Sequence, residues 1–157
     1  MNIETLESID IPLQQSQKVR KSFLFSDFSK GKHSYEAWTA MWGKENIIVF
    51  VDIPDGDTIN QWVGAVNNKL LWIDENKDEI TQAVIDSDIF SNIHEWSSEA
   101  VTSEDFRAGL YISELGFSFQ WKQTQVYIQC DRDYFLGHCI CLYLDEENRI
   151  TGCGLEG

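Results

Sequence analysis

The feature that most constrains the fold is an alternation of apolar and polar residues that starts at Leu115. From Leu115 to Trp121, and again from Val126 to Cys130, every second residue is apolar. Successive side chains of a β-strand point to opposite faces of the sheet, so a period of two predicts strands. The short polar segments between them are typical of turns. The predicted strands cover 115–121, 126–131, 138–144 and 149–155 and form a four-strand meander.

The earlier part of the chain predicts further strands and then helices. Residues 47–53 are β-branched and almost wholly apolar, which indicates a buried strand. Shorter strands are predicted at 23–25 and 35–42, around a loop at 26–34. Apolar residues then recur at helical spacing, with Asp57 or Thr58 as the first cap and Asp74 as the second. The predicted helices cover 58–72, the segment from Asp74 to just before Ser87, and 103–110, with irregular structure at 86–101.

This order of elements is typical of the α+β class. N-terminal strands come first, two to three helices lie in the centre, and the meander closes the chain, which favours a mainly antiparallel sheet. A chain of 157 residues is long enough for one self-sufficient core, so we expect a single domain over 1–157. Residues 1–20 are polar and weakly patterned, and they are predicted to form a peripheral arm.

The charge of the chain restricts its partners. The net charge is −14, from 12 basic and 26 acidic residues. Such a surface repels nucleic acids and anionic membranes, so neither is an expected partner. A basic protein partner is compatible with the charge, although acidity also serves solubility alone. The oligomeric state does not follow from the sequence.

The four cysteines favour a cytoplasmic protein. Cys130, Cys139, Cys141 and Cys153 all lie in the last 28 residues. No pair has the loop spacing of a structural zinc site, so we interpret them as small apolar side chains and expect no metal or other cofactor. The N-terminus lacks the apolar segment of a signal peptide, and no apolar run is long enough to span a membrane.

The stretch Cys130–Leu144 contains the candidate site residues. Asp131 and Asp133 belong to a polar turn, Gly137 permits a bulge, and His138 opens the following strand. His138 could act as a general base oriented by a carboxylate, or as a metal ligand beside the two aspartates. The alternative is a histidine that anchors the turn through hydrogen bonds. No catalytic residue follows from the pattern alone.

The same residues carry a resemblance to a known family. A short helix with Phe106 and Leu110 leads to two alternating strands and then to a D-x-D-x-F-x-G-H turn. The turn consists of Asp131, Asp133, Phe135, Gly137 and His138. The segment 103–157 resembles the bacterial domain of unknown function family 2262, and 38–84 does so more weakly. The resemblance implies the fold and a bacterial source, not a reaction. We expect these five residues to be the binding residues.

Two classes of function remain open from the sequence. The chain has no nucleophile elbow, phosphate-binding glycine loop, dinucleotide fingerprint or H-E-x-x-H motif. We therefore favour a protein-binding module of the immunity or regulatory type over an enzyme. The alternative is a metal-dependent or acid–base hydrolase centred on His138, Asp131 and Asp133.

Overall fold

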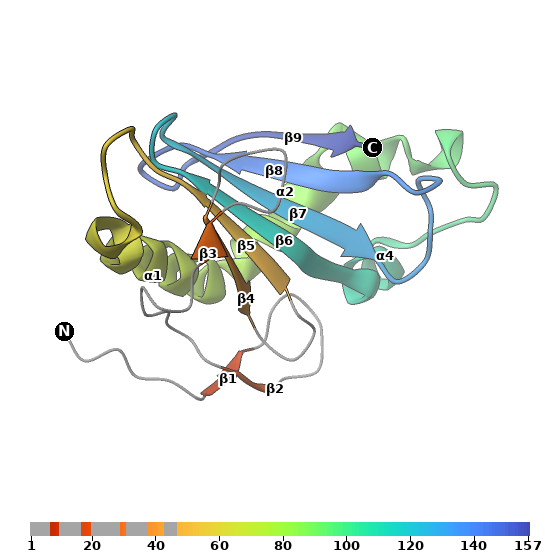
Figure 1. The fold of residues 1–157 in the computed structure, drawn as a ribbon. Helices are drawn as coiled ribbons and strands as arrows, with labels where there is room; N and C mark the ends of the chain where they lie inside the picture. Colours follow the sequence, from red (N-terminus) through yellow and green to blue (C-terminus); the bar gives the residue numbers. More distant parts are fainter. Residues whose placement is uncertain (1–6, 10–16, 20–28, 31–37, 43–46) are drawn as a thin grey trace.

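The computed structural model describes residues 7–9, 17–19, 29–30, 38–42 and 47–157, with side chains from Ile47 onward (Figure 1). The strands are β1 (Glu7–Ile9), β2 (Gln17–Val19), β3 (Ser29–Lys30), β4 (Trp38–Trp42), β5 (Ile47–Asp52), β6 (Leu110–Ser118), β7 (Gln123–Cys130), β8 (Cys139–Leu144) and β9 (Ile150–Glu156). The helices are α1 (Ile59–Glu75), α2 (Lys77–Asp86), α3 (Asp88–Ser91), the 3-10 helix η2 (Ile93–Glu95) and α4 (Ser103–Gly109).

Strands β3 to β9 form one sheet in the order of the sequence, and β1 pairs with β2 separately. The α+β class and the C-terminal four-strand meander are confirmed, because β6 to β9 pair antiparallel one after the other. The sheet as a whole is mixed, however, and the expectation of a mainly antiparallel sheet has to be corrected. β5 and β6 run parallel, with Val49 opposite Leu115 and Val51 opposite Phe117. The helices between them return the chain to its starting edge, so both strands run in the same direction.

The helical region is richer than the predicted two to three helices. Within 47–157 the structure has four α-helices and η2. The segment 86–101 was predicted to be irregular, but it contains α3 and η2. These are single turns that bury Ile89 and Ile93, too short to show a helical period. Thr58 caps α1 as predicted, with its backbone N–H donating to Gln61 Oε1 at 2.6 Å. Asn76, rather than Asp74, precedes α2.

The core lies between the sheet and helices α1 and α2, which lie on the same side of it in Figure 1. Val49, Val51 and Leu115 of the sheet are fully buried there, together with Val66 and Leu70 of α1. The other face of the sheet carries half-buried side chains, among them those at 125, 127 and 143. Both faces of β8 are apolar in sequence, but on this outer face only Cys141 is buried, whereas Cys139 and Tyr143 are half-buried.

Several early predictions concern the N-terminal part of the chain. The predicted strand at 23–25 lies outside the described residues. The predicted loop at 26–34 includes strand β3. The predicted arm at 1–20 contains the β1–β2 pair in its described residues. Among the helices that the structure describes, none is long and apolar enough to cross a membrane.

Candidate functional site

The turn between β7 and β8, residues 133–138, is held by hydrogen bonds within its own sequence. The Asp133 carboxylate accepts a hydrogen bond from the Gly137 backbone N–H at 2.7 Å. The carbonyl oxygen of Phe135 accepts the backbone N–H of His138 at 3.1 Å and lies 2.9 Å from His138 Nδ1. Because a carbonyl oxygen can only accept a hydrogen bond, this contact assigns the proton of the neutral imidazole to Nδ1. Nε2 then carries a lone pair and no proton.

Aromatic packing fixes the base of the turn. Tyr134 and Phe135 are buried, and both pack edge-on against Phe106 of α4, with ring centroids 6.1 Å and 6.3 Å away. Trp96 also packs against Phe135, with ring centroids 6.2 Å apart, and against the His138 ring at 5.3 Å. Such aromatic pairs stabilise beyond the area they bury. The turn is therefore anchored by its middle residues and not only by its ends.

The tip of the turn has an unusual backbone. Leu136 has φ +54° and Gly137 has φ +88°, both in the left-handed region. Glycine adopts this region freely, but a leucine does so at a cost of roughly 1–2 kcal/mol. The Leu136 side chain is also 71% exposed, so burial does not offset that cost.

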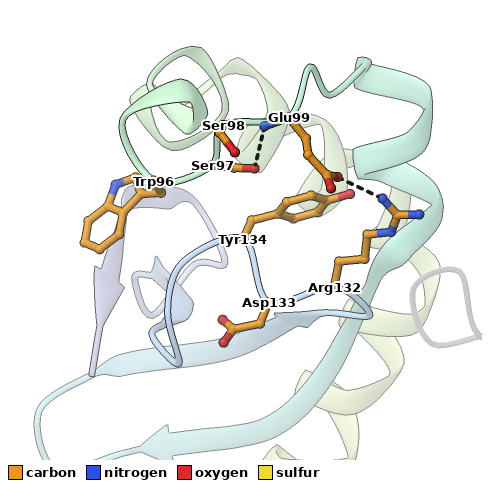
Figure 2. A pocket seen from close by; sticks show the side chains of 7 residues that line it. All are labelled: Trp96, Ser97, Ser98, Glu99, Arg132, Asp133 and Tyr134. Carbon is orange, nitrogen blue, oxygen red and sulfur yellow. Dashed lines mark hydrogen bonds and ion pairs between the residues drawn. The ribbon is translucent and has the colours of Figure 1, made fainter.

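An open pocket of about 490 Å³ lies beside the turn. Figure 2 shows Trp96–Glu99 facing Arg132–Tyr134 across it. Arg132 Nη1 pairs with Glu99 Oε2 at 3.2 Å, and Ser97 Oγ accepts the Glu99 backbone N–H at 3.3 Å. Both ends of the Arg132–Glu99 pair are more than 60% exposed, so the pair stabilises the fold little and can be broken cheaply by a ligand.

The structure brings four of the five predicted site residues together. Asp133, Phe135, Gly137 and His138 form the turn described above. Asp131 lies elsewhere: its backbone N–H donates to the carbonyl of Gly109 at 2.8 Å, and its carboxylate lies against Gly109, the last residue of α4.

His138 is oriented by a backbone carbonyl, and neither predicted aspartate appears among its hydrogen-bond partners in the described residues. The predicted general-base arrangement needs such a carboxylate. Across the part of the chain that the structure describes, no group of three or more His, Cys, Asp or Glu side chains could hold a metal ion.

Sequence reasoning missed Leu136, Trp96 and Glu99. Leu136 follows Tyr134 and Phe135, and nothing in this run of three apolar residues distinguishes the exposed one from the two buried ones. The local signal is the glycine directly after it, which indicates a tight turn at this point but does not predict a left-handed leucine. Trp96 and Glu99 lie some 35 residues earlier in the chain, and no local pattern links them to the turn.

The cysteines do not contribute a reactive group to the turn. All four are free thiols, of which Cys141 is buried and the others are half-buried. Burial raises the pKa of Cys130 to about 12, with a further contribution from Asp131 and Asp133. Burial also raises the pKa of Cys141 to about 12. A thiol with such a pKa is protonated at neutral pH and is a poor nucleophile.

Comparison with known proteins identifies a family. The family model of DUF2262, described as an uncharacterized protein conserved in bacteria, matches residues 25–155. This match reaches well beyond the segment 103–157 on which the resemblance was strongest. No curated protein and no solved structure matches the chain. Since the family model covers most of the chain, including the whole turn and its pocket, the chain belongs to the DUF2262 family.

Proposed function

We propose that this protein is a binding module that docks a basic segment of another protein on the turn 133–138 and its pocket. Leu136 is the apolar anchor of this surface, and the carboxylates around the pocket attract the partner. Immunity or regulatory proteins are the natural class for such a module. The proposal places the protein in the cytoplasm, where its four free thiols would stay reduced.

The observation that carries the proposal is the exposed leucine at φ +54°. A strained residue persists only where the surrounding structure holds it, and such residues cluster at functional sites. Here the Asp133–Gly137 hydrogen bond and the buried Phe135 hold the tip in place. The apolar side chain is thus presented on a pre-organised turn, which lowers the entropy cost of binding.

The local charge supports a basic partner. The pocket lining holds Glu99 and Asp133 against the single Arg132, and Glu95 and Asp131 directly flank the two lining segments in the sequence. Complementary charge at the rim of an interface speeds encounter and selects among partners, whereas an apolar anchor supplies most of the binding energy. An anchor surrounded by carboxylates is therefore suited to a cationic segment with an apolar pocket.

The test compares quantitative capture by the wild-type protein with capture by Leu136→Asn, followed by affinity measurements on each captured protein. Asparagine keeps the left-handed backbone but removes the apolar side chain. We expect a basic protein whose affinity falls at least about tenfold with Leu136→Asn and falls again with Glu99→Lys. Leu71→Asn and Glu75→Lys on α1 are matched controls, because both positions are exposed and remote from the turn in sequence. If every captured protein binds Leu136→Asn as tightly as wild type, the proposal is wrong.

The hydrolase alternative has less support. Its histidine donates to a backbone carbonyl, and Asp131 lies against Gly109 rather than beside the imidazole. The Nε2 lone pair of His138 favours it, but Gly157 lies against that side of the ring. A hydrolytic activity that His138→Gln abolishes, in a protein that binds no basic partner, would establish the alternative instead.

A further inference from the structure

A second pocket, of about 410 Å³, lies at the opposite end of β7 from the turn. It is enclosed by α1, the β6–β7 hairpin and the β8–β9 hairpin, which lie close together at one end of the sheet in Figure 1. Its lining includes Trp62, Phe117 and Phe119 on the apolar side and Lys69, Lys122 and Asn148 on the polar side. Nothing in the proposed binding of a protein partner uses this pocket.

The apolar side of the pocket is a stacked aromatic pair. The rings of Trp62 and Phe119 lie with centroids 4.6 Å apart and planes 24° from parallel. The Trp62 indole N–H donates to Asp57 Oδ2 at 2.8 Å, which fixes the orientation of the indole. Both side chains are only half-buried although they are large and apolar. A fixed, partly uncovered aromatic wall is suited to a flat or apolar ligand.

The polar side of the pocket is cationic in a strongly acidic part of the chain. Residues 47–157 contain 20 acidic and 6 basic residues, yet two of the six lysines and arginines line this pocket. Glu146 is the one carboxylate in the lining, and it pairs with Lys122 at 3.6 Å. Lys69 and Lys122 against Glu146 leave the lining with net positive charge.

Lys69 is positioned to contact a ligand. Its ammonium group donates to the Glu146 carbonyl at 3.0 Å and to Asn148 Oδ1 at 2.5 Å. An ammonium group has three donors, so among the described residues one N–H of Lys69 is left for another acceptor. Burial lowers the pKa of Lys69, and Asp145 and Glu146 act against that shift. An anion in the pocket would raise this pKa again, because it favours the charged form.

From the stacked aromatic pair and the adjoining lysines we propose that this pocket binds a small aromatic carboxylate. The ring lies against Trp62 and Phe119, and the carboxylate accepts hydrogen bonds from Lys69 and Lys122. A neutral or cationic analogue of the same shape keeps the stacking but loses these contacts. The affinity therefore depends on the charge of the ligand as well as on its shape.

The experiment uses three probes of nearly equal size on the full chain: 1-naphthoate, 1-naphthylmethanol and 1-naphthylmethylamine. Binding is followed by two-dimensional NMR, which resolves the backbone amides and the Trp62 indole N–H. We expect 1-naphthoate to saturate with a Kd of about 1 mM or tighter, and to bind at least about tenfold more tightly than the other two. The shifted signals should include Trp62, Lys122 and Asn148.

Two variants test the polar side. Lys122→Gln changes an exposed side chain and should weaken 1-naphthoate binding about threefold, whereas Lys69→Met should weaken it at least about tenfold. Lys77→Gln on α2 is the matched control and should leave the affinity unchanged. The proposal is overturned if 1-naphthoate fails to saturate, binds no better than the amine, or shifts signals only outside the pocket. It is also overturned if Lys122→Gln and Lys69→Met both bind 1-naphthoate like wild type.

Discussion

Leu136 and Gly137 are adjacent residues in left-handed conformations, at φ +54° and +88°, a region that glycine adopts freely and leucine does not. The left-handed backbone of the leucine costs free energy, and its exposed side chain gains too little from burial to offset that cost. A residue kept at such a cost is more informative about function than a buried residue of the same type, whose packing explains it fully.

Replacing this leucine is therefore expected to stabilise the fold. Leu136→Asn should raise the free energy of unfolding by about 0.5–1 kcal/mol, because asparagine tolerates the left-handed region better. Urea denaturation at fixed pH measures the change. Leu71→Asn is the control and should lower the free energy of unfolding. Leu71 is 49% exposed within α1, and asparagine lowers helix stability there by about 0.5 kcal/mol. A loss of stability with Leu136→Asn would contradict the strain argument.

The cysteines allow a second prediction for single residues. Cys130 and Cys141 have pKa values of about 12, so almost none of either thiol is ionised at pH 8. Iodoacetamide reacts with the thiolate, and we expect both residues to be alkylated at least about tenfold more slowly in the folded protein than in urea. Peptide mass spectrometry resolves the two sites. Equal rates of alkylation in the folded and unfolded protein would show that these thiols are not protected by burial.

Residue patterns predicted the polar turn and its glycine, but not its geometry. Asp133 and Gly137 were identified because aspartate and glycine have strong turn preferences. The partner of His138 was not predictable, because a carbonyl and a carboxylate are both within reach of an imidazole at that position. The role of Leu136 was missed for a related reason: apolar character predicts burial only on average.

Helix α4 and the segment after β7 are in close contact at Gly109, the described glycine at which an added Cβ would have the least space. A Cβ on Gly109 would lie 2.1 Å from Asp131 Oδ1 and 2.9 Å from its Cγ. Gly109 thus lets the last turn of α4 approach the segment after β7. This contact explains the position of Asp131 better than a catalytic role does.

A double-mutant cycle tests this contact. Gly109→Ala alone should lower the free energy of unfolding by about 1–3 kcal/mol, because the side chain of Asp131 must move. Gly109→Ala combined with Asp131→Ala should recover most of that loss, since the clashing carboxylate is gone. Gly116→Ala is the control in β6, where the nearest atom to an added Cβ is 3.6 Å away. Additive effects of the two changes would contradict the contact.

The strands and helices were predictable to different degrees. The meander β6–β9 was predictable because its pairs are local and its first two strands show the period of two. The start of β6 was predicted too late, since a bulge between Ile112 and Glu114 interrupts that period. The parallel β5–β6 pair was not foreseen, because residues 53–109 separate the two strands and their pairing depends on how the intervening helices pack.

At the scale of the whole molecule, the charge is unevenly divided along the chain. Residues 47–157 hold 20 acidic and 6 basic residues, whereas residues 1–46 hold six of each. The entire net charge of −14 therefore belongs to the part that contains both pockets. Neither pocket was predictable from the sequence, since each is lined by segments far apart in the chain.

This charge predicts a dependence of stability on salt. Raising NaCl from about 10 mM to about 500 mM should raise Tm by a few degrees, because screening weakens the repulsion among the carboxylates of the folded state. Differential scanning calorimetry measures the shift. A variant with Asp55 and Glu75 replaced by lysine, both exposed, should show a smaller shift. An unchanged or falling Tm in the wild-type protein would contradict the expectation.

The parallel pairing of β5 with β6 has a consequence for the newly made chain. Ribosomes synthesise β5, with its buried Val49 and Val51, before any of the residues that cover them on the helical side. The meander β6–β9 can form from neighbouring hairpins, but β5 closes a loop that contains every helix from α1 to α4. Loop closure of that length is slow compared with hairpin formation. During synthesis this apolar strand therefore remains without its parallel partner β6, and we expect it to be the segment on which a chaperone first acts.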